Sequence, residues 1–121
     1  NQALCLDTRD HEFVTLWYGV VDPASLRLTY CSAGHDPVLV FRPHKTGSGG
    51  PSGGEPARID VFELDVGGMV LGIDAGQTYE RGIFQLRAGD VLLGTTDGVM
   101  DTVNYEGRKF GRRAVRDTVV E

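Results

Sequence analysis

Short runs of β-branched and aromatic residues follow one another along this chain of 121 residues, and turn residues separate them. The first two runs cover residues 13–21 and 26–32, with an Asp-Pro turn sequence between them. Such side chains favour strands, and proline presets the backbone angle that a turn needs. In the second run apolar and other residues alternate, which is typical of a half-buried strand. The two runs therefore predict a β-hairpin.

The remaining pattern continues in the same way and contains little helix before the last residues. Residues 43–57 are rich in Gly, Ser and Pro, which predicts a loop that is mobile over residues 46–56. Antiparallel sheets covered by helices make an α+β fold. The other predicted elements are strands at 38–41, 58–64, 78–86 and 91–95, the first and last of them buried, a helical turn at 99–103 and a helix from 111 to 120.

Composition excludes several classes of function. The net charge is −5, so the chain has no overall basic balance of the kind that nucleic acid or an anionic membrane attracts. No apolar run approaches the roughly 20 residues that span a bilayer, and the N-terminus does not resemble a signal peptide. We expect a cytoplasmic protein in which Cys5 and Cys31 are reduced, although their spacing leaves a disulfide open. The ends, without an initial Met or a final helix stop, predict a fragment of a larger domain.

Three short motifs carry the chemistry of the sequence. The most informative is residues 89–99, where an apolar run ends in Asp97 followed at once by Gly98. Carboxylates at strand ends bind Mg²⁺ or Mn²⁺, which prefer oxygen ligands, but one carboxylate does not make a site. From the residues alone, a helix N-cap or a turn residue is the preferred interpretation of Asp97. The other two motifs are residues 33–37, which contain His35, and residues 71–73.

Taken in order, these motifs resemble the SpoIIE/RsbU-like branch of the metal-dependent serine/threonine phosphatases, the protein phosphatase type 2C family. The resemblance implies a two-sheet antiparallel β-sandwich flanked by helices, here truncated. It also implies hydrolysis of phosphoserine or phosphothreonine by water activated by two Mn²⁺ or Mg²⁺ ions, on small anti-anti-sigma-like regulatory proteins. A homodimer is left open. The matching segments are residues 13–16, 33–37, 71–73, 89–93, 96–99 and 110–111.

The resemblance also assigns roles to individual residues. Asp97 matches the family's metal-ligating aspartate, Gly98 the glycine beside it, and His35 the histidine of the Ala-Gly-His motif, for which both a catalytic and a structural role stay open. Asp101 stands where the family often has Glu and receives no metal. The family's upstream Gly-Asp and downstream Asp-Asp motifs have no counterpart, so residues 1–121 correspond to part of the phosphatase domain and should be inactive alone.

Two other functions compete with the phosphatase. One is a phosphatase-like regulatory module that binds a partner without turning it over, and the other is an unrelated β-sandwich binding domain. Some residues also carry two interpretations. Asp90 is expected to be a turn residue, and the basic residues at 108–109 and 112–113 suggest either a solvated helix start or a surface that docks a phosphoprotein. Of Trp17 and Tyr18, neighbours in a strand, one should face the core and the other should not.

Overall fold

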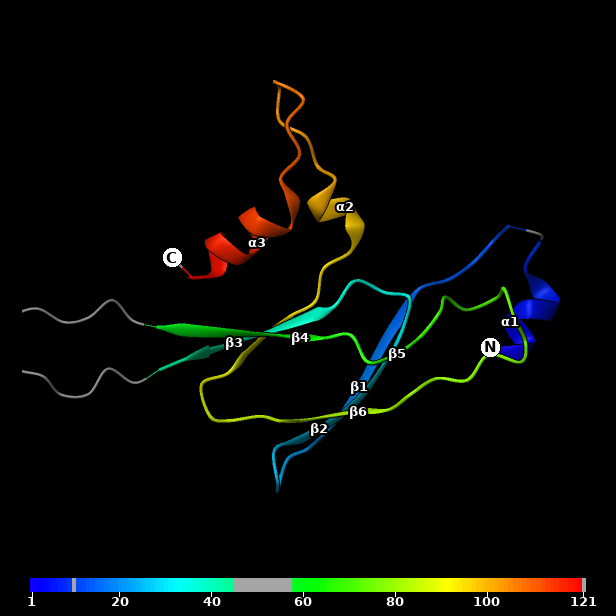
Figure 1. Cartoon of the computed structure of the whole chain (residues 1–121), viewed down its shortest axis with the longest axis horizontal. Coiled ribbons are helices and arrows are strands. Elements are labelled where there is room, and N and C mark those ends of the chain that lie inside the picture. The colour runs from blue at the N-terminus through cyan, green and yellow to red at the C-terminus, as the bar shows by residue number, and fades with distance from the viewer. Residues whose placement is uncertain (10, 45–57, 121) are drawn as a thin grey trace, which may run out of the picture. The chain divides into compact units, whose positions relative to one another are not determined.

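The computed structural model describes residues 1–9, 11–44 and 58–120, and the predicted mobile loop at 46–56 lies outside them. The described chain divides into two compact units, and each contains one sheet. The first unit consists of residues 1–38 and 63–86, and the second of residues 39–62 and 87–121. The α+β class is confirmed: two mainly antiparallel sheets occur with three helices in the described ranges (Figure 1).

Strand β2 (Arg27–Ala33) is the centre of the first unit. It pairs antiparallel with β1 (Leu16–Asp22) on one side. Its other edge pairs antiparallel with β6 (Gly82–Gln85) and parallel with the two-residue β5 (Gly67–Gly68). The unit also contains helix α1 (Gln2–Asp7). The predicted hairpin is therefore confirmed, although its first strand begins at Leu16.

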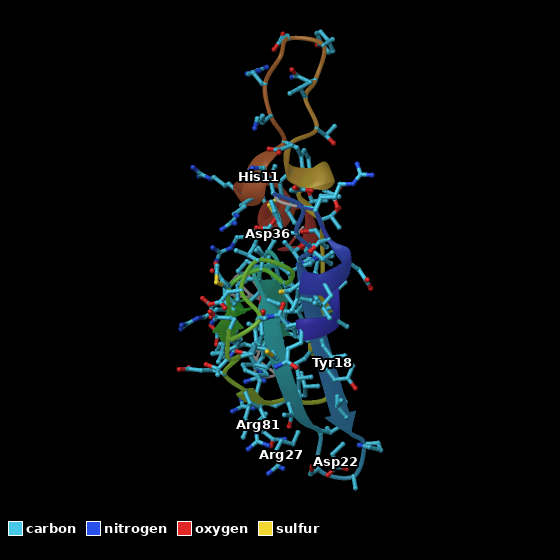
Figure 2. All side chains as sticks on the ribbon, turned by 90° about the vertical axis from the view of Figure 1, so that its right-hand side faces the viewer. His11, Tyr18, Asp22, Arg27, Asp36 and Arg81 are labelled. Carbon is cyan, nitrogen blue, oxygen red and sulfur yellow. The ribbon has the colours of Figure 1, made fainter. Side chains whose placement is uncertain are left out.

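The hairpin turn follows from its sequence. Asp22 accepts a hydrogen bond from the backbone N–H of Ala24 at 3.0 Å and another from the Ser25 hydroxyl at 2.6 Å. An aspartate that bonds the backbone two residues onward closes a turn without help from distant residues. Figure 2 shows Asp22 and Arg27 at this end of the hairpin, with Tyr18 farther along β1.

The buried face of this sheet forms the core of the first unit. Leu28 and Tyr30 of β2 are almost fully buried. The ring of Trp17 stacks on Tyr30 with 5.6 Å between centroids, and its indole N–H donates to the carbonyl of Leu64 at 3.0 Å. Tyr18, the next residue, is 63% exposed, so the prediction that neighbouring aromatic residues face opposite sides is confirmed.

The second unit is built on a three-stranded sheet in the order β4-β3-β7, in which β3 and β7 are antiparallel. Val40 and Phe41 of β3 are buried, as predicted, and so is Val115 of the last helix. The first residue of β3 and the last two of β4 belong to the first unit. The elements are β3 (Val38–Pro43), β4 (Ile59–Leu64), β7 (Val91–Leu93), α2 (Asp97–Met100) and α3 (Gly111–Val120).

The prediction of a buried strand at 91–95 is wrong. Strand β7 covers only Val91–Leu93, and Val91 and Leu92 are 53% and 40% exposed. A short apolar run favours a buried strand, but β7 lies at the end of the described sheet order and pairs only with β3 there. A strand in that position leaves part of its surface uncovered. No helix in the described part of the chain is both long and apolar enough to cross a membrane.

Candidate functional site

Asp97 is the first residue of α2, and three residues separate it from Leu93, the last residue of β7. Its backbone carbonyl accepts from the N–H of Asp101 at 2.7 Å, which closes the single turn of this helix. Thr96 is the N-cap, so the Asp97 side chain does not cap the helix. Within the described ranges the exposed Asp97 carboxylate makes no hydrogen bond and no ion pair. The structural roles weighed for this side chain therefore find no support in its contacts.

Gly98 follows Asp97 and offers one oxygen, its backbone carbonyl. That carbonyl accepts from the hydroxyl of Thr102 at 2.7 Å. A side-chain carbon at Gly98 would lie 3.5 Å from the Thr96 hydroxyl, an ordinary contact, so neither space nor backbone conformation requires glycine here. The role of Gly98 beside a metal stays a prediction.

Asp101 has a structural partner. One of its carboxylate oxygens lies 2.7 Å from the ammonium nitrogen of Lys109, and both side chains are exposed. This ion pair connects the end of α2 with the segment before α3. Asp101 is therefore paired with Lys109, and the expectation that it does not bind a metal stays a prediction.

His35 lies just after β2 and is partly buried. Its ring Nδ1 is 2.9 Å from the carbonyl of Asp36, so Nδ1 carries the proton and donates it to that carbonyl. The backbone carbonyl of His35 accepts from the Ser32 hydroxyl at 3.2 Å. Both contacts suit the structural role, an imidazole whose hydrogen bonds are met by nearby backbone. The catalytic role of His35 stays a prediction.

Gly34 has a clear physical reason in the same motif. Its φ of +63° lies in the left-handed region, which side chains other than glycine rarely adopt. A side-chain carbon at this position would stand 2.4 Å from Cγ1 of Val70 and 2.9 Å from its backbone nitrogen. The Ala-Gly-His sequence thus brings the end of β2 close to the chain around Val70.

Asp90 forms the turn that was predicted, and it also makes an ion pair that sequence reasoning missed. Its carboxylate accepts the N–H of Arg87 at 2.9 Å and binds the Arg42 guanidinium through two bonds of 2.8 and 2.7 Å. The carboxylate side chain is only 3% exposed. The hydrogen bond from Arg42 lowers the pKa of Asp90 below its ordinary value. Phe41 pairs with Val91, so Arg42 lies opposite Asp90. The sequence alone does not reveal this ion pair, because it depends on the register between β3 and β7.

The described residues do not fit a complete metal centre. No three His, Cys, Asp or Glu residues among them come together as metal ligands. His35 lies in the first unit and Asp97 in the second. An exposed carboxylate without a partner suits a hard cation as one ligand, but Mg²⁺ and Mn²⁺ need about six oxygen ligands. The cysteines are free thiols, as expected.

Comparisons with known proteins found one family and a curated relative. The family described as "Stage II sporulation protein E (SpoIIE)" matches residues 1–121. Protein IcfG of Synechocystis sp. (strain ATCC 27184 / PCC 6803 / Kazusa) is 28% identical over 111 residues. That match covers 88% of this chain but 15% of IcfG. No solved structure matched the chain.

Proposed function

Because the chain belongs to the SpoIIE family, within the SpoIIE/RsbU-like branch of the metal-dependent protein phosphatases, we propose that it serves the hydrolysis of phosphoserine and phosphothreonine on proteins. The substrate would be a small cytoplasmic regulator of the anti-anti-sigma kind. The family match over residues 1–121 supports the reaction class. The observation that carries the site is the exposed Asp97 carboxylate at the start of α2, which has no structural partner in the described ranges.

Asp97 is proposed as one oxygen ligand of the Mn²⁺ or Mg²⁺ on which phosphatases of this family depend. A bound divalent cation stabilises charge that develops on a phosphoryl group. Asp97 is well placed for that purpose because its carboxylate is exposed and forms no competing ion pair within the described chain. The rest of the ligand set is not assigned to residues of this chain, and no further step is derived from the ion.

The test is a steady-state assay of the natural polypeptide that contains this chain, with and without Asp97→Asn. Loss of the charged ligand should lower Mn²⁺-dependent kcat on a phosphoserine protein by about a hundredfold or more. Thermal unfolding should not change, because the exposed side chain has no partner to lose among the described residues. The matched control is Asp117→Asn, an exposed carboxylate on α3. Full activity of Asp97→Asn would refute the assignment.

A non-catalytic regulatory module is the second candidate, and one observation favours it. The described residues do not bring together three potential metal ligands. A module of this kind would bind a phosphoprotein and leave it phosphorylated. If the natural polypeptide releases no phosphate across a wide range of Mn²⁺ and Mg²⁺ concentrations but still binds the phosphoprotein, this candidate replaces the enzyme.

A further inference from the structure

The residues between α2 and α3 form a closed, projecting loop, 102–110, in the second unit (Figure 1). The backbone N–H of Phe110 donates to Thr102 at 2.8 Å, and Val103 and Lys109 form a β-bridge. At its tip the side chain of Asn104 accepts the N–H groups of Glu106 and Arg108 at 3.0 and 2.9 Å. These bonds give the loop a defined shape that begins two residues after the end of α2.

Positive charge is concentrated at this loop and at the helix that follows. Residues 108–116 contain five of the 12 Lys and Arg residues of the chain and no Asp or Glu. Outside this segment seven basic residues face 17 acidic ones. The local sign of charge is therefore opposite to that of the chain as a whole, and it favours an anionic partner at this place.

The two cationic side chains of the loop, Arg108 and Lys109, each form an ion pair that another anion can replace. Arg108 contacts Glu106, and Lys109 contacts Asp101, with the cationic side chains 76% and 65% exposed. Exposed ion pairs contribute roughly 0–1 kcal/mol because water screens them. A phosphate group offers a doubly charged acceptor that a guanidinium binds through two parallel hydrogen bonds. Exchange of a carboxylate partner for a phosphate is therefore favourable at Arg108 and Lys109.

An open hollow of about 410 Å³ lies beside these cations. Arg108 and Lys109 line it together with the apolar side chains of Val103, Phe110 and Ala114. Val103 and Phe110 are 55% and 45% exposed. Apolar contact surface next to paired cations suits a short peptide that carries both a phosphate and an apolar side chain. A long nucleic acid strand is less suitable, because the acidic remainder of the chain would repel it.

We propose that loop 102–110 and the start of α3 form a docking surface for an acidic protein segment bearing phosphoserine or phosphothreonine. Arg108 and Lys109 bind the phosphate, and Val103 and Phe110 contact an apolar neighbour of the phosphorylated residue. The inference rests on the proposed function, since it names the part of the chain that would recognise the phosphoprotein. Loop 102–110 directly follows α2, which begins with Asp97, so recognition and the proposed ligand share one unit.

The test measures binding, so that it does not depend on turnover. A short fluorescent peptide with one phosphoserine among glutamates and a leucine is titrated with the 121-residue chain, and its unphosphorylated twin is titrated in parallel. The phosphopeptide should bind roughly tenfold more tightly, because charge-assisted bonds to phosphate add to the acidic attraction. In NMR spectra the phosphopeptide should shift the amide signals of residues 103–114. Equal affinity for both peptides would overturn the proposal.

Charge reversal locates the binding. Arg108→Glu/Lys109→Glu should abolish the preference for phosphate, and the milder Arg108→Gln/Lys109→Gln should do the same if the first variant unfolds. The matched control is Arg27→Glu/Arg81→Glu in the first unit, which makes the same change in net charge at two exposed arginines (Figure 2). An equal loss in the control would show that only net charge matters and would overturn the proposal. Equally tight binding of an oligouridine to the unmodified chain would also overturn it.

The proposed function can fail separately. If the natural polypeptide releases no phosphate while the chain still prefers the phosphopeptide, the catalytic proposal fails and the docking surface stands. If the natural polypeptide is active but Arg108→Gln/Lys109→Gln leaves its KM for a phosphoprotein unchanged, the docking surface fails and the catalytic proposal stands.

Discussion

Asp90 is a buried carboxylate that connects three parts of the second unit. It binds the Arg42 guanidinium of β3 through two hydrogen bonds and accepts the N–H of Arg87 in the turn before β7. Arg42 in turn lies over the ring of Phe62 in β4, 5.0 Å from its centroid. Removal of the charge at Asp90 would deprive the nearly buried Arg42 guanidinium of this counter-ion. Loss of one partner from a buried ion pair is strongly destabilising, because the remaining charge stays buried.

We therefore expect Asp90→Asn to lower the free energy of unfolding by about 3 kcal/mol. Chemical denaturation would measure the loss, and amide exchange at Leu92 and Leu93 would show whether β7 opens first. Asp60→Asn is the matched control, since Asp60 of β4 pairs with His44, the residue after β3, and the Asp60 and His44 side chains are 31% and 46% exposed. Little change is expected in the control. Similar losses for both variants would contradict a special role for the buried pair.

The same pair sets a dependence of stability on pH. The hydrogen bond from Arg42 lowers the pKa of Asp90 in the folded chain. A carboxyl group with a lowered folded pKa contributes stability above its unfolded pKa of about 3.9, and this contribution disappears as the pH falls through the folded value. Stability should thus fall below about pH 4, and the Asp90→Asn variant should fall less steeply there. The measurement is the free energy of unfolding of both proteins between neutral and acidic pH. If the two free energies fall in parallel as the pH decreases, this prediction is wrong.

At the scale of elements, the close approach of β2 to the chain around Val70 depends on Gly34. Gly34→Ala combines an unfavourable φ of +63° with a carbon placed 2.4 Å from Val70 Cγ1, so we expect a loss of about 2–4 kcal/mol. Gly107→Ala separates the two causes, because Gly107 has a φ of +76° but open space around it. It should cost only about 1 kcal/mol. Thermal unfolding of both variants is the measurement, and equal losses would argue against the steric part.

Elements with local causes were the ones that could be predicted from the sequence. The β1–β2 hairpin was predicted because alternation and the Asp22 turn lie within one short stretch. Helix α3 was predicted from its apolar positions, and Val115 is indeed buried. The exposure of β7 was not predicted, because an apolar run does not reveal which neighbours a strand will have. The pair between Arg42 and Asp90 joins residues 48 positions apart and becomes visible only with the register of β3 and β7.

The candidate site divides in the same way. Asp97 could be selected because its motif is contiguous, and its role as a metal ligand stays a prediction. The hydrogen bonds of His35 also involve near neighbours, yet residue type alone could not separate a structural imidazole from a catalytic one. The hollow beside loop 102–110 depends on how the loop folds back on itself, so the sequence showed its charges but not its shape.

At the scale of the whole molecule, each unit is assembled from two separate stretches of chain. The polypeptide enters the second unit after residue 38, returns after 62 and leaves again after 86. Contacts that hold a unit together therefore join residues far apart in sequence, as between Trp17 and Leu64. His35 and Asp97, the two residues singled out for chemistry, belong to different units. Neither unit brings three potential metal ligands together among its described residues.

Metal binding is for that reason a property we expect of a complete ligand set and not of Asp97 alone. Across the described residues no three potential ligands come together, and one carboxylate does not offset the cost of removing water from Mn²⁺. The 121-residue chain should therefore bind Mn²⁺ no more tightly than its Asp97→Asn variant, as measured by electron paramagnetic resonance of free Mn²⁺. It should also leave an aryl phosphate unhydrolysed. A saturable site that Asp97→Asn removes would contradict this, because it would mean that the chain gathers enough ligands by itself. Activity confined to the natural polypeptide, and lost there in Asp97→Asn, would mean that Asp97 acts with ligands that the described residues do not supply.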